Sequence, residues 1–516
     1  MRHLYLGNSV LIAATLVACG GGGGVGNSDP LPSPVLLMSQ SSQKIPIKST
    51  GNIAWTTTNS AECAGSGQLF GPLLANGSLS IKPAAGGKYN YTITCTGSGG
   101  TVNKTVSVIV PMQVFSTSYE NKNVIPFNHT TIPMLQLLGT DAQINSNQTG
   151  IEFMRSAAFA DFFQEGEYSG FVVASRVNNI YSNTPGIFSD SPGRAYFLSL
   201  DAKNNWVDRT SELLKNESDR DVCVTASYSL VADFNNDGKP DVFVACTGLD
   251  YEINIPKTNF TTNQQVYLSN QILFLSQKDS TYKRVEVPYN IYGHKASAAD
   301  INGDGITDLV ITNSHTLDAN TYQTHGTKFT NPFVLIGNGD GTFTKDTSYI
   351  PENIHEYTGL LSENEIYAVD LIPIDGRIDL ILSGGNSVWF KQNINKKYSI
   401  DNMKFLPRGD SQYTNSKLMF PTDILYVNNY FYFVQNSQYG KLGLPYDQSV
   451  ITKINATTLN TSIIYDNIVP FKDESVWRTG PNQVKHTSDG YLVPIEAACA
   501  GSAGNKPTVC NLRIKM

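Results

Sequence analysis

Two nine-residue stretches of this 516-residue chain share one pattern of oxygen-bearing side chains, and each leads into an apolar run. They are DFNNDGKPD at residues 233–241 and DINGDGITD at residues 300–308. Oxygen side chains stand at positions one, three, five and nine, position seven offers a backbone carbonyl, and glycine stands at position six. Ca²⁺ takes six to eight hard oxygen ligands, and glycine lets such a loop turn sharply. We therefore predict two structural Ca²⁺ sites, formed by Asp233, Asn235, Asp237, Lys239 and Asp241 and by Asp300, Asn302, Asp304, Ile306 and Asp308, with Lys239 and Ile306 using their carbonyls.

These loops are predicted to connect strands. An EF-hand loop begins in the same way, but it needs Glu at position 12 and a helix on each side. Position 12 is Val244 or Ile311 here, and the residues after each loop are apolar and β-branched, which is typical of strands. A plain turn rich in Asn, Asp and Gly is the simpler alternative. Two matching loops with matching flanks favour a repeated structural unit instead.

Weaker copies of the loop extend the repeat along the chain. Aligned on the first Asp, they fall at Asp161, Asp370 and Asp423, with an echo near Asp489. Separations of 53 to 72 residues suit a four-stranded propeller blade. The first copy lacks the Asn and the last Asp, and the fourth has Pro in place of the Asn, so we expect both to bind Ca²⁺ weakly or not at all. The 43 Gly, 24 Pro and 10% aromatic residues also indicate an all-β protein rich in turns.

A second signature lies between the loops and is clearest in VLIGNGDGTF at residues 334–343, a strand, a Gly-rich hairpin and a strand that opens on an aromatic residue. Together the two signatures resemble the FG-GAP/VCBS repeat family, the propeller of integrin α subunits and of many exported bacterial proteins. The resemblance is strong over about residues 225–385 and degenerate on either side. It implies a six- or seven-bladed β-propeller over residues 112–516, with all Ca²⁺ loops on one face.

The first residues are typical of an export signal. Arg2 supplies a positive charge, and the apolar run from Val10 to Ala18 is too short to span a bilayer. Its end, LVACG at residues 16–20, resembles the bacterial lipobox, which implies a signal peptide at residues 1–18 and lipid on Cys19. An ordinary cleaved signal with an incidental cysteine is the alternative. The Gly-rich residues 19–33 form a flexible tether, and the resemblance implies the bacterial outer membrane, with its surface and periplasmic sides both left open.

Residues 34–111 alternate apolar and polar side chains in short runs, which predicts a small β-sandwich. The segments around Trp55, Cys63 and Cys95 resemble the bacterial Ig-like modules that follow a lipid anchor. Trp55 is expected in the core. The expected role of this domain is that of a spacer.

Seven cysteines also support export, because six remain when Cys19 is set aside for lipid. Proximity in sequence suggests the pairs Cys63 with Cys95, Cys223 with Cys246, and Cys499 with Cys510, although other pairings stay open. A zinc site is the alternative, but the cysteines and histidines lack zinc-ligand spacing.

The face opposite the Ca²⁺ loops is predicted to bind the ligand. The connections expected there are long, at residues 175–194, 247–264 and 313–329, and such loops are often functional. They carry Tyr251, Phe260 and Tyr322, which suit contacts with sugar or protein. Residues six before each loop Asp should ring the central channel on this face, namely Arg155, Ser227, His294, Asn364 and Lys417. The cations among them could receive an acidic ligand such as a uronate-bearing polysaccharide.

A formal net charge of −7 argues against a sequence-independent nucleic-acid binder. The chain has no Walker A loop, GxSxG elbow or HExxH helix, and we name no catalytic residue. The leading hypothesis is a membrane-anchored, calcium-stabilised propeller that binds a glycan or a protein, as in adhesion. One alternative is a polysaccharide lyase or hydrolase that uses the channel mouth, and another is a scaffold of an outer-membrane assembly.

Overall fold

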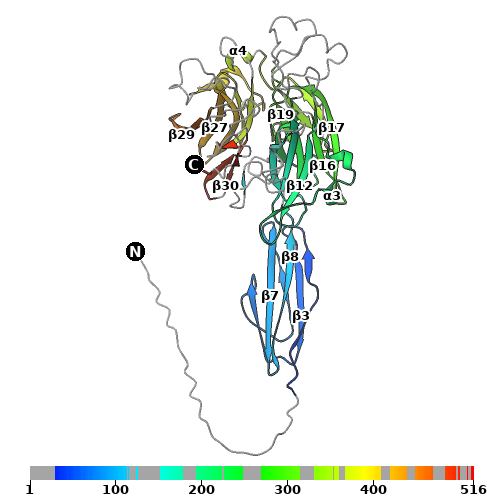
Figure 1. The fold of residues 1–516 in the computed structure, drawn as a ribbon. Coiled ribbons are helices and arrows are strands. Elements are labelled where there is room, and N and C mark those ends of the chain that lie inside the picture. The colour runs from blue at the N-terminus through cyan, green and yellow to red at the C-terminus, as the bar shows by residue number, and fades with distance from the viewer. Residues whose placement is uncertain are drawn as a thin grey trace, which may run out of the picture. The chain divides into compact units, whose positions relative to one another are not determined.

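The computed structural model is almost entirely β-structure, as predicted (Figure 1). It describes residues 30–112, 114, 124–125, 151–177, 193–223, 226–247, 269–313, 331–352, 354–358, 366–407, 419–437, 448–468, 483–487, 489–494, 498–499, 508–509 and 513–516. The predicted signal peptide and Cys19 lie outside these ranges. In the part of the chain that the structure describes, helix is limited to short segments such as α3 (Thr210–Leu213) and α4 (His355–Thr358). Within the described ranges, none of the helices is both long enough and apolar enough to span a membrane.

The chain divides into two compact units. The described part of the first comprises residues 30–43, 52–81 and 90–107, and the second comprises residues 44–51, 82–89 and the described residues from 108 onward. Each unit has its own hydrophobic core.

The N-terminal strands form a β-sandwich. One sheet has the order β1 (Val35–Met38), β3 (Gly51–Thr58), β6 (Gly77–Ile81), and the other has the order β2 (Ser42–Lys44), β8 (Gly100–Val110), β7 (Gly87–Gly97), β4 (Glu62–Gly67), β5 (Gly71–Leu73). Trp55 and Leu36 from the first sheet pack against Cys63, Ile93 and Cys95 from the second. The expected place of Trp55 in the core is therefore confirmed.

Cys63 and Cys95 form the predicted disulfide. They are register partners on the neighbouring strands β4 and β7, with their Cα atoms 4.1 Å apart. This bridge therefore lies within one sheet, whereas the conserved bridge of antibody domains joins two sheets. The Ig-like assignment of the sandwich stays a prediction.

The rest of the described chain is built from six four-stranded sheets and one two-stranded sheet, formed by β32 (Ala498–Cys499) and β33 (Thr508–Val509). Five of the four-stranded sheets are antiparallel, with their strands in chain order. The first consists of β10 (Ile151–Ala160), β11 (Ser169–Val177), β12 (Arg194–Leu200) and β13 (Trp206–Asp208), the second of β14 (Ala226–Ala232), β15 (Asp241–Cys246), β16 (Ser269–Ser276) and β17 (Tyr282–Ile291), and the third of β18 (Ala296–Ala299), β19 (Asp308–Ile311), β20 (Phe333–Gly337) and β21 (Phe343–Asp346). The fourth consists of β22 (Ala368–Ile374), β23 (Arg377–Ser383), β24 (Ser387–Phe390) and β25 (Met403–Leu406), and the fifth of β26 (Met419–Val427), β27 (Tyr430–Ser437), β28 (Gln448–Asn455) and β29 (Thr461–Ile468). A sixth sheet has the order β34 (Ile514–Lys515), β31 (Tyr491–Pro494), β30 (Val484–Thr487), β9 (Val124–Ile125). Sheets of this kind, repeated along the chain, are the blades of a β-propeller.

The six sheets close into a ring. The first strands of successive blades, β10, β14, β18, β22 and β26, are neighbours. At the closing edge, the N–H of Val484, the first residue of β30, donates to Asp423 in β26 (2.9 Å), and the Ala157 N–H in β10 donates to Gln483 (3.1 Å). Strand β9 comes from before the first blade and pairs with β30. The sequence predicted six or seven blades. The described residues form six blades, and β9 completes the last one.

Burial explains the composition of the blade strands. The strands β15, β18 and β19 are buried at every residue, because each blade is covered on both faces. Successive hydrophobic clusters lie between successive pairs of blades, from the first two blades to the last two. Such strands read as continuous apolar runs rather than alternating ones.

Two of the aligned loop positions prove to be wrong. Asp370 and Asp423 lie inside the strands β22 and β26, and both are fully buried. In the fourth blade the chain turns at Asp375 and Gly376 instead, both with positive φ, as a two-residue hairpin requires. The fourth and fifth blades therefore have tight hairpins where the second and third have nine-residue loops.

Candidate functional site

The two Asp/Asn loops have the backbone that their sequences predict. Glycine at position six has a φ of 79° at Gly238 and 87° at Gly305, a region that favours glycine. Inside the second blade's loop, the Asp233 carboxylate accepts the N–H groups of Asp237 (3.1 Å) and Gly238 (2.8 Å). Asp300 accepts the equivalent pair in the next blade, at 3.1 and 2.9 Å. The first Asp therefore organises each loop around its own side chain.

The ninth position has a further role that joins strands within a blade. Asp241 is fully buried and accepts the N–H groups of Phe234 (2.8 Å) and Ser276 (2.7 Å). Asp308 accepts those of Ile301 and Gly337, both at 2.9 Å. Ser276 and Gly337 end the third strands of their blades, so each carboxylate ties the inner hairpin to the third strand. Burial raises the pKa of Asp241 to about 7 and that of Asp308 to about 6.

The donor chemistry of these loops suits Ca²⁺, since it consists of carboxylate, amide and carbonyl oxygens. Burial, and to a lesser degree the nearby Asp237, raise the pKa of Asp233, so a cation would favour its charged form. However, the side chains of the described residues nowhere bring three or more Asp, Glu, His or Cys together in a group that could hold a metal ion. In the second blade this agrees with Asp241 turning both oxygens to backbone N–H groups. Ca²⁺ binding by the ten predicted ligands stays a prediction.

The opposite ends of the same strands carry the predicted ligand face. Ala226 pairs with Cys246, and Ala296 pairs with Ile311, each at the end of the hairpin away from its Asp loop. The long connections after Cys246 and Ile311 therefore leave from this face, as predicted. Residues 178–192, 248–268 and 314–330 within these connections lie outside the described residues, and so do Tyr251, Phe260, Tyr322, Asn364 and Lys417.

The other channel-mouth candidates lie within inner strands or just before them. Arg155 falls at a bulge of β10. Ser227 is half-buried, and its hydroxyl lies within hydrogen-bond distance of two carbonyl acceptors, those of Gly293 (2.6 Å) and Ala245 (3.0 Å). It thus links the second blade to the segment before His294.

His294 lies in an aromatic cluster at the channel mouth. Its ring centroid is 5.0 Å from that of Tyr292 and 5.0 Å from that of Tyr367, which precedes the inner strand of the next blade. The His294 N–H donates to the Thr312 hydroxyl (2.9 Å), which fixes the backbone there. His294 and Tyr367 are half-buried, and Tyr292 is buried. The channel mouth therefore exposes parts of the His294 and Tyr367 rings, and hydrogen bonding holds the His294 backbone in place.

Directly below this rim, buried polar side chains fill the centre of the ring. Lys295 forms an ion pair with Asp423, and both side chains are fully buried. The ring of Tyr228 lies 5.1 Å from the Lys295 ammonium and 5.5 Å from that of Lys485. Ser297 donates to Asp370 (2.8 Å), and Ser156 shares a hydrogen bond with Ser229 (2.7 Å). Because these residues come from all six blades together with Gln483, the channel is closed at this level.

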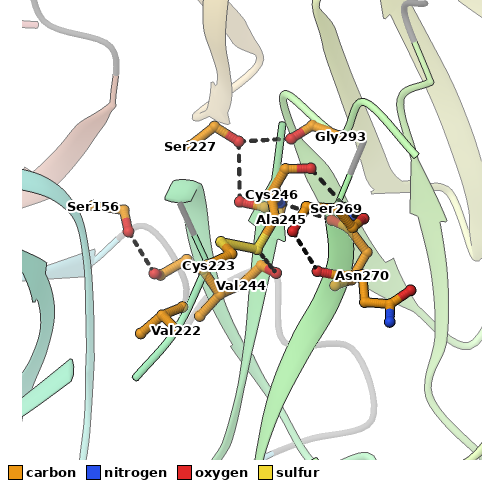
Figure 2. The surroundings of a disulfide bond; sticks show 12 residues. Ser156, Val222, Cys223, Ser227, Val244, Ala245, Cys246, Ser269, Asn270 and Gly293 are labelled. Atoms are coloured by element: carbon orange, nitrogen blue, oxygen red, sulfur yellow. Dashed lines mark hydrogen bonds between the residues drawn. A yellow bond between two sulfur atoms is a disulfide. The ribbon is translucent and has the colours of Figure 1, made fainter. Parts of the chain in front are cut away.

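The Cys223–Cys246 disulfide, predicted from sequence, braces the same face (Figure 2). The carbonyl of Cys246 accepts the Gly293 N–H (3.0 Å) and the side-chain amide of Gln271 (3.1 Å). The carbonyl of Cys223 accepts the Gly193 N–H (2.8 Å), at the end of the first long connection. The bridge therefore fixes the ends of several connections next to His294. The third predicted pair is not described, because Cys510 lies outside the described residues.

Sequence reasoning missed the central cluster. Asp370 and Asp423 were aligned as loop residues, and Lys295 and Lys485 stand in no motif. A signal was available in the Asp375-Gly376 pair, since Asp-Gly between apolar runs is a strong hairpin signal. It would have placed Asp370 inside a strand.

Comparisons with known proteins support the repeat. Residues 233–311 match the family of FG-GAP-like repeats, from the second blade's Asp loop to the end of β19. No curated protein matches the sequence. Among solved structures, the chain is similar to a quinonprotein alcohol dehydrogenase-like protein from Bacteroides thetaiotaomicron VPI-5482, with 11% identity, 84% of this chain and 96% of that chain covered, and a TM-score of 0.29. It is also similar to the exotype rhamnogalacturonan lyase YesX, with 11% identity, coverage of 84% and 83%, and a TM-score of 0.31. Neither similarity is strong enough to support an assignment of function.

Proposed function

We propose that this chain is a binding protein whose calcium-stabilised propeller receives a glycan at the channel mouth, on the face opposite the Asp loops. The observation that carries this proposal is the half-buried pair His294 and Tyr367 above a channel closed by Lys295 and Asp423. A ligand approaching from this face meets aromatic rings and a closed floor. Aromatic faces suit the apolar faces of sugar rings, and polar groups around them supply orientation.

The remaining parts of the proposal concern anchorage. Lipid on Cys19 and the Gly-rich tether would hold the protein at the bacterial outer membrane, and the β-sandwich would act as a spacer. The net charge of −7 and the paired cysteines are compatible with an exported protein of this kind.

A binding screen with a turnover readout tests this function. Purified protein would be screened against neutral and acidic polysaccharides, with binding and release of oligosaccharide measured in parallel. We expect binding without release, and a loss of affinity of about fivefold for His294→Ala and for Tyr367→Ala, since stacked aromatic contacts are worth about 1 kcal/mol each.

Tyr430→Ala is the matched control, because Tyr430 lies at the β26–β27 hairpin, at the end of the blade away from the channel mouth. Release of oligosaccharide would support the alternative of a polysaccharide-active enzyme. If the protein bound no polysaccharide but did bind a protein of the cell envelope, the proposed ligand would be a protein instead of a glycan. Equal losses in all three variants would remove the channel mouth as the site.

A further inference from the structure

The first blade has the same kind of loop as the second and third blades, although its sequence has lost the pattern. The Asp161 carboxylate accepts the N–H groups of Glu165 (2.7 Å) and Gly166 (2.9 Å), as Asp233 does in the next blade. Positions four and six, Gln164 and Gly166, have φ values of 55° and 70°. The corresponding values in the second blade are 57° and 79°. The two loops therefore follow the same path.

The side chains of this first loop cannot form the oxygen cage of the others. Position three is Phe163, and position nine is Ser169. The Ser169 hydroxyl accepts the Phe162 N–H (3.0 Å), which replaces the hydrogen bond between Phe234 and Asp241. Position five is Glu165, whose carboxylate is half-buried and carries a negative charge. The loop thus keeps its shape and the carboxylates of Asp161 and Glu165, but it lacks the oxygen side chain at position three and the carboxylate at position nine that complete the set for Ca²⁺.

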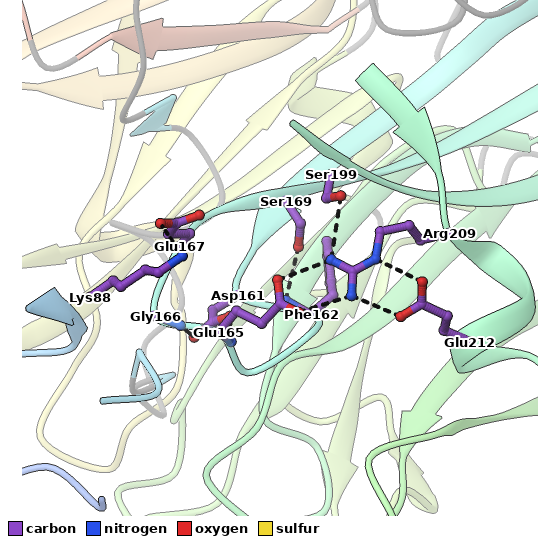
Figure 3. A network of polar contacts seen from close by, with 10 residues as sticks. All are labelled: Lys88, Asp161, Phe162, Glu165, Gly166, Glu167, Ser169, Ser199, Arg209 and Glu212. Carbon is purple, nitrogen blue, oxygen red and sulfur yellow. Dashed lines mark hydrogen bonds and ion pairs between the residues drawn. The ribbon is translucent and has the colours of Figure 1, made fainter. Parts of the chain in front are cut away.

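The Arg209 guanidinium lies between the carboxylates of Glu165, at position five of the loop, and Glu212 (Figure 3). Arg209 donates from two nitrogens to the two oxygens of Glu165, both at 2.9 Å. The Cζ atom of Arg209 lies 4.0 Å from the centre of the Phe163 ring. Arg209 also donates to both oxygens of Glu212, at 2.8 and 2.7 Å. Side chains at positions three and five of the loop therefore both contact this cation.

The position of Arg209 is fixed by the blade itself. It directly follows β13, and its N–H donates to the carbonyl of Phe197 in β12 (2.9 Å). Glu212 comes from α3, one turn further on. A planar guanidinium with two bidentate carboxylates is a strongly oriented arrangement, which a lysine could not reproduce.

From this geometry we propose that Arg209 is a built-in cation that holds the loop at residues 161–169, in the role that a bound metal ion would have in the second and third loops. The comparison with those loops rests on the proposed Ca²⁺ sites, whereas the role of Arg209 does not. The first blade then needs no metal at this loop, which leaves the loops of the second and third blades as the two proposed Ca²⁺ sites.

Hydrogen exchange of the full chain, measured by peptide, tests this role. In Arg209→Gln we expect exchange in residues 161–169 to be about tenfold faster or more, since hydrogen bonds between charged groups are the strong ones. Arg209→Lys should show an intermediate effect. Arg220→Gln is the matched control, because Arg220 belongs to the same blade and pairs with Asp208 and Glu217 without contacting the loop in any of these bonds. Equal exchange in Arg209→Gln and Arg220→Gln would overturn the proposal.

A second measurement separates this inference from the Ca²⁺ proposal. In the unmodified protein, EDTA should leave exchange in residues 161–169 unchanged while exchange in residues 233–241 and 300–308 accelerates. Faster exchange in residues 161–169 with EDTA would overturn the role of Arg209. If none of the three loops responds to EDTA, the Ca²⁺ proposal fails, and Arg209 is then judged by the variants alone.

Discussion

Lys295 in the third blade and Asp423 in the fifth form an ion pair in which both side chains are fully buried. The two residues are 128 positions apart in the sequence and lie in blades that are separated by the fourth. The pair therefore crosses the centre of the ring. Asp423 also accepts the Val484 N–H at the closing edge, so one carboxylate joins the third, fifth and sixth blades.

Removing one partner of this pair should strongly destabilise the propeller. We expect Lys295→Met to lower the free energy of unfolding by about 3–5 kcal/mol, because Asp423 is left as a buried charge without its partner. The double variant Lys295→Met, Asp423→Leu should recover part of this loss, since it removes both charges. Denaturant unfolding measures each value, with Lys453→Met as a control on a half-buried lysine that lies over Tyr430. A single variant as stable as the control would show that the pair contributes nothing to closure.

Calcium removal should lower the stability of the propeller. A site at a free Ca²⁺ concentration 100 times its dissociation constant contributes about 2.7 kcal/mol, and EDTA removes that contribution. Asp237→Ala and Asp304→Ala should each remove part of it, whereas Asp340→Ala, an exposed Asp in the β20–β21 hairpin, should not. Thermal melting with and without EDTA gives the comparison. Identical melting curves for the unmodified protein would remove the Ca²⁺ claim.

The disulfide between Cys223 and Cys246 should stabilise the ligand face. It closes a loop of 23 residues, for which the chain-entropy model gives about 3 kcal/mol. We expect the double variant Cys223→Ser, Cys246→Ser to lose about that much, and to bind ligand more weakly because Gly293 next to His294 is held by the Cys246 carbonyl. The matched variant Cys63→Ser, Cys95→Ser should leave the unfolding of the propeller unchanged. If the Cys223→Ser, Cys246→Ser variant bound its ligand with unchanged affinity, the disulfide would have no role in ligand binding.

The sequence was most informative where local chemistry repeats. The Asp loops predicted the strands that flank them, the face on which the loops lie and the glycines with positive φ. Those features depend on residues within one hairpin. The blade number, by contrast, depends on how the ring closes, and the closing contacts of Gln483 and Val484 join residues that are far apart in sequence.

In the candidate site, too, local features could be predicted from the sequence and contacts between distant residues could not. His294 was placed at the channel mouth by counting back from a loop Asp, but Tyr367 and Tyr292 were not expected beside it. The central pair of Lys295 and Asp423 and the contact of Arg209 with Glu165 are tertiary contacts without a local motif. No spacing rule in a single sequence could have brought these side chains together.

Closure of the ring should depend on pH through His486. This half-buried residue lies in β30 and pairs with Val124 of β9, and burial lowers its pKa below the usual 6.5. The unfolded chain therefore binds a proton more readily than the folded one, so this contribution to stability is complete above pH 6.5 and is lost as the pH falls toward the lower folded pKa. In His486→Gln that part of the pH dependence should disappear. The difference between the two proteins, measured by denaturant unfolding from pH 7.5 down to pH 5 (the range that brackets the usual histidine pKa), isolates His486 from other titrating groups. Parallel stability curves over this range would contradict the prediction.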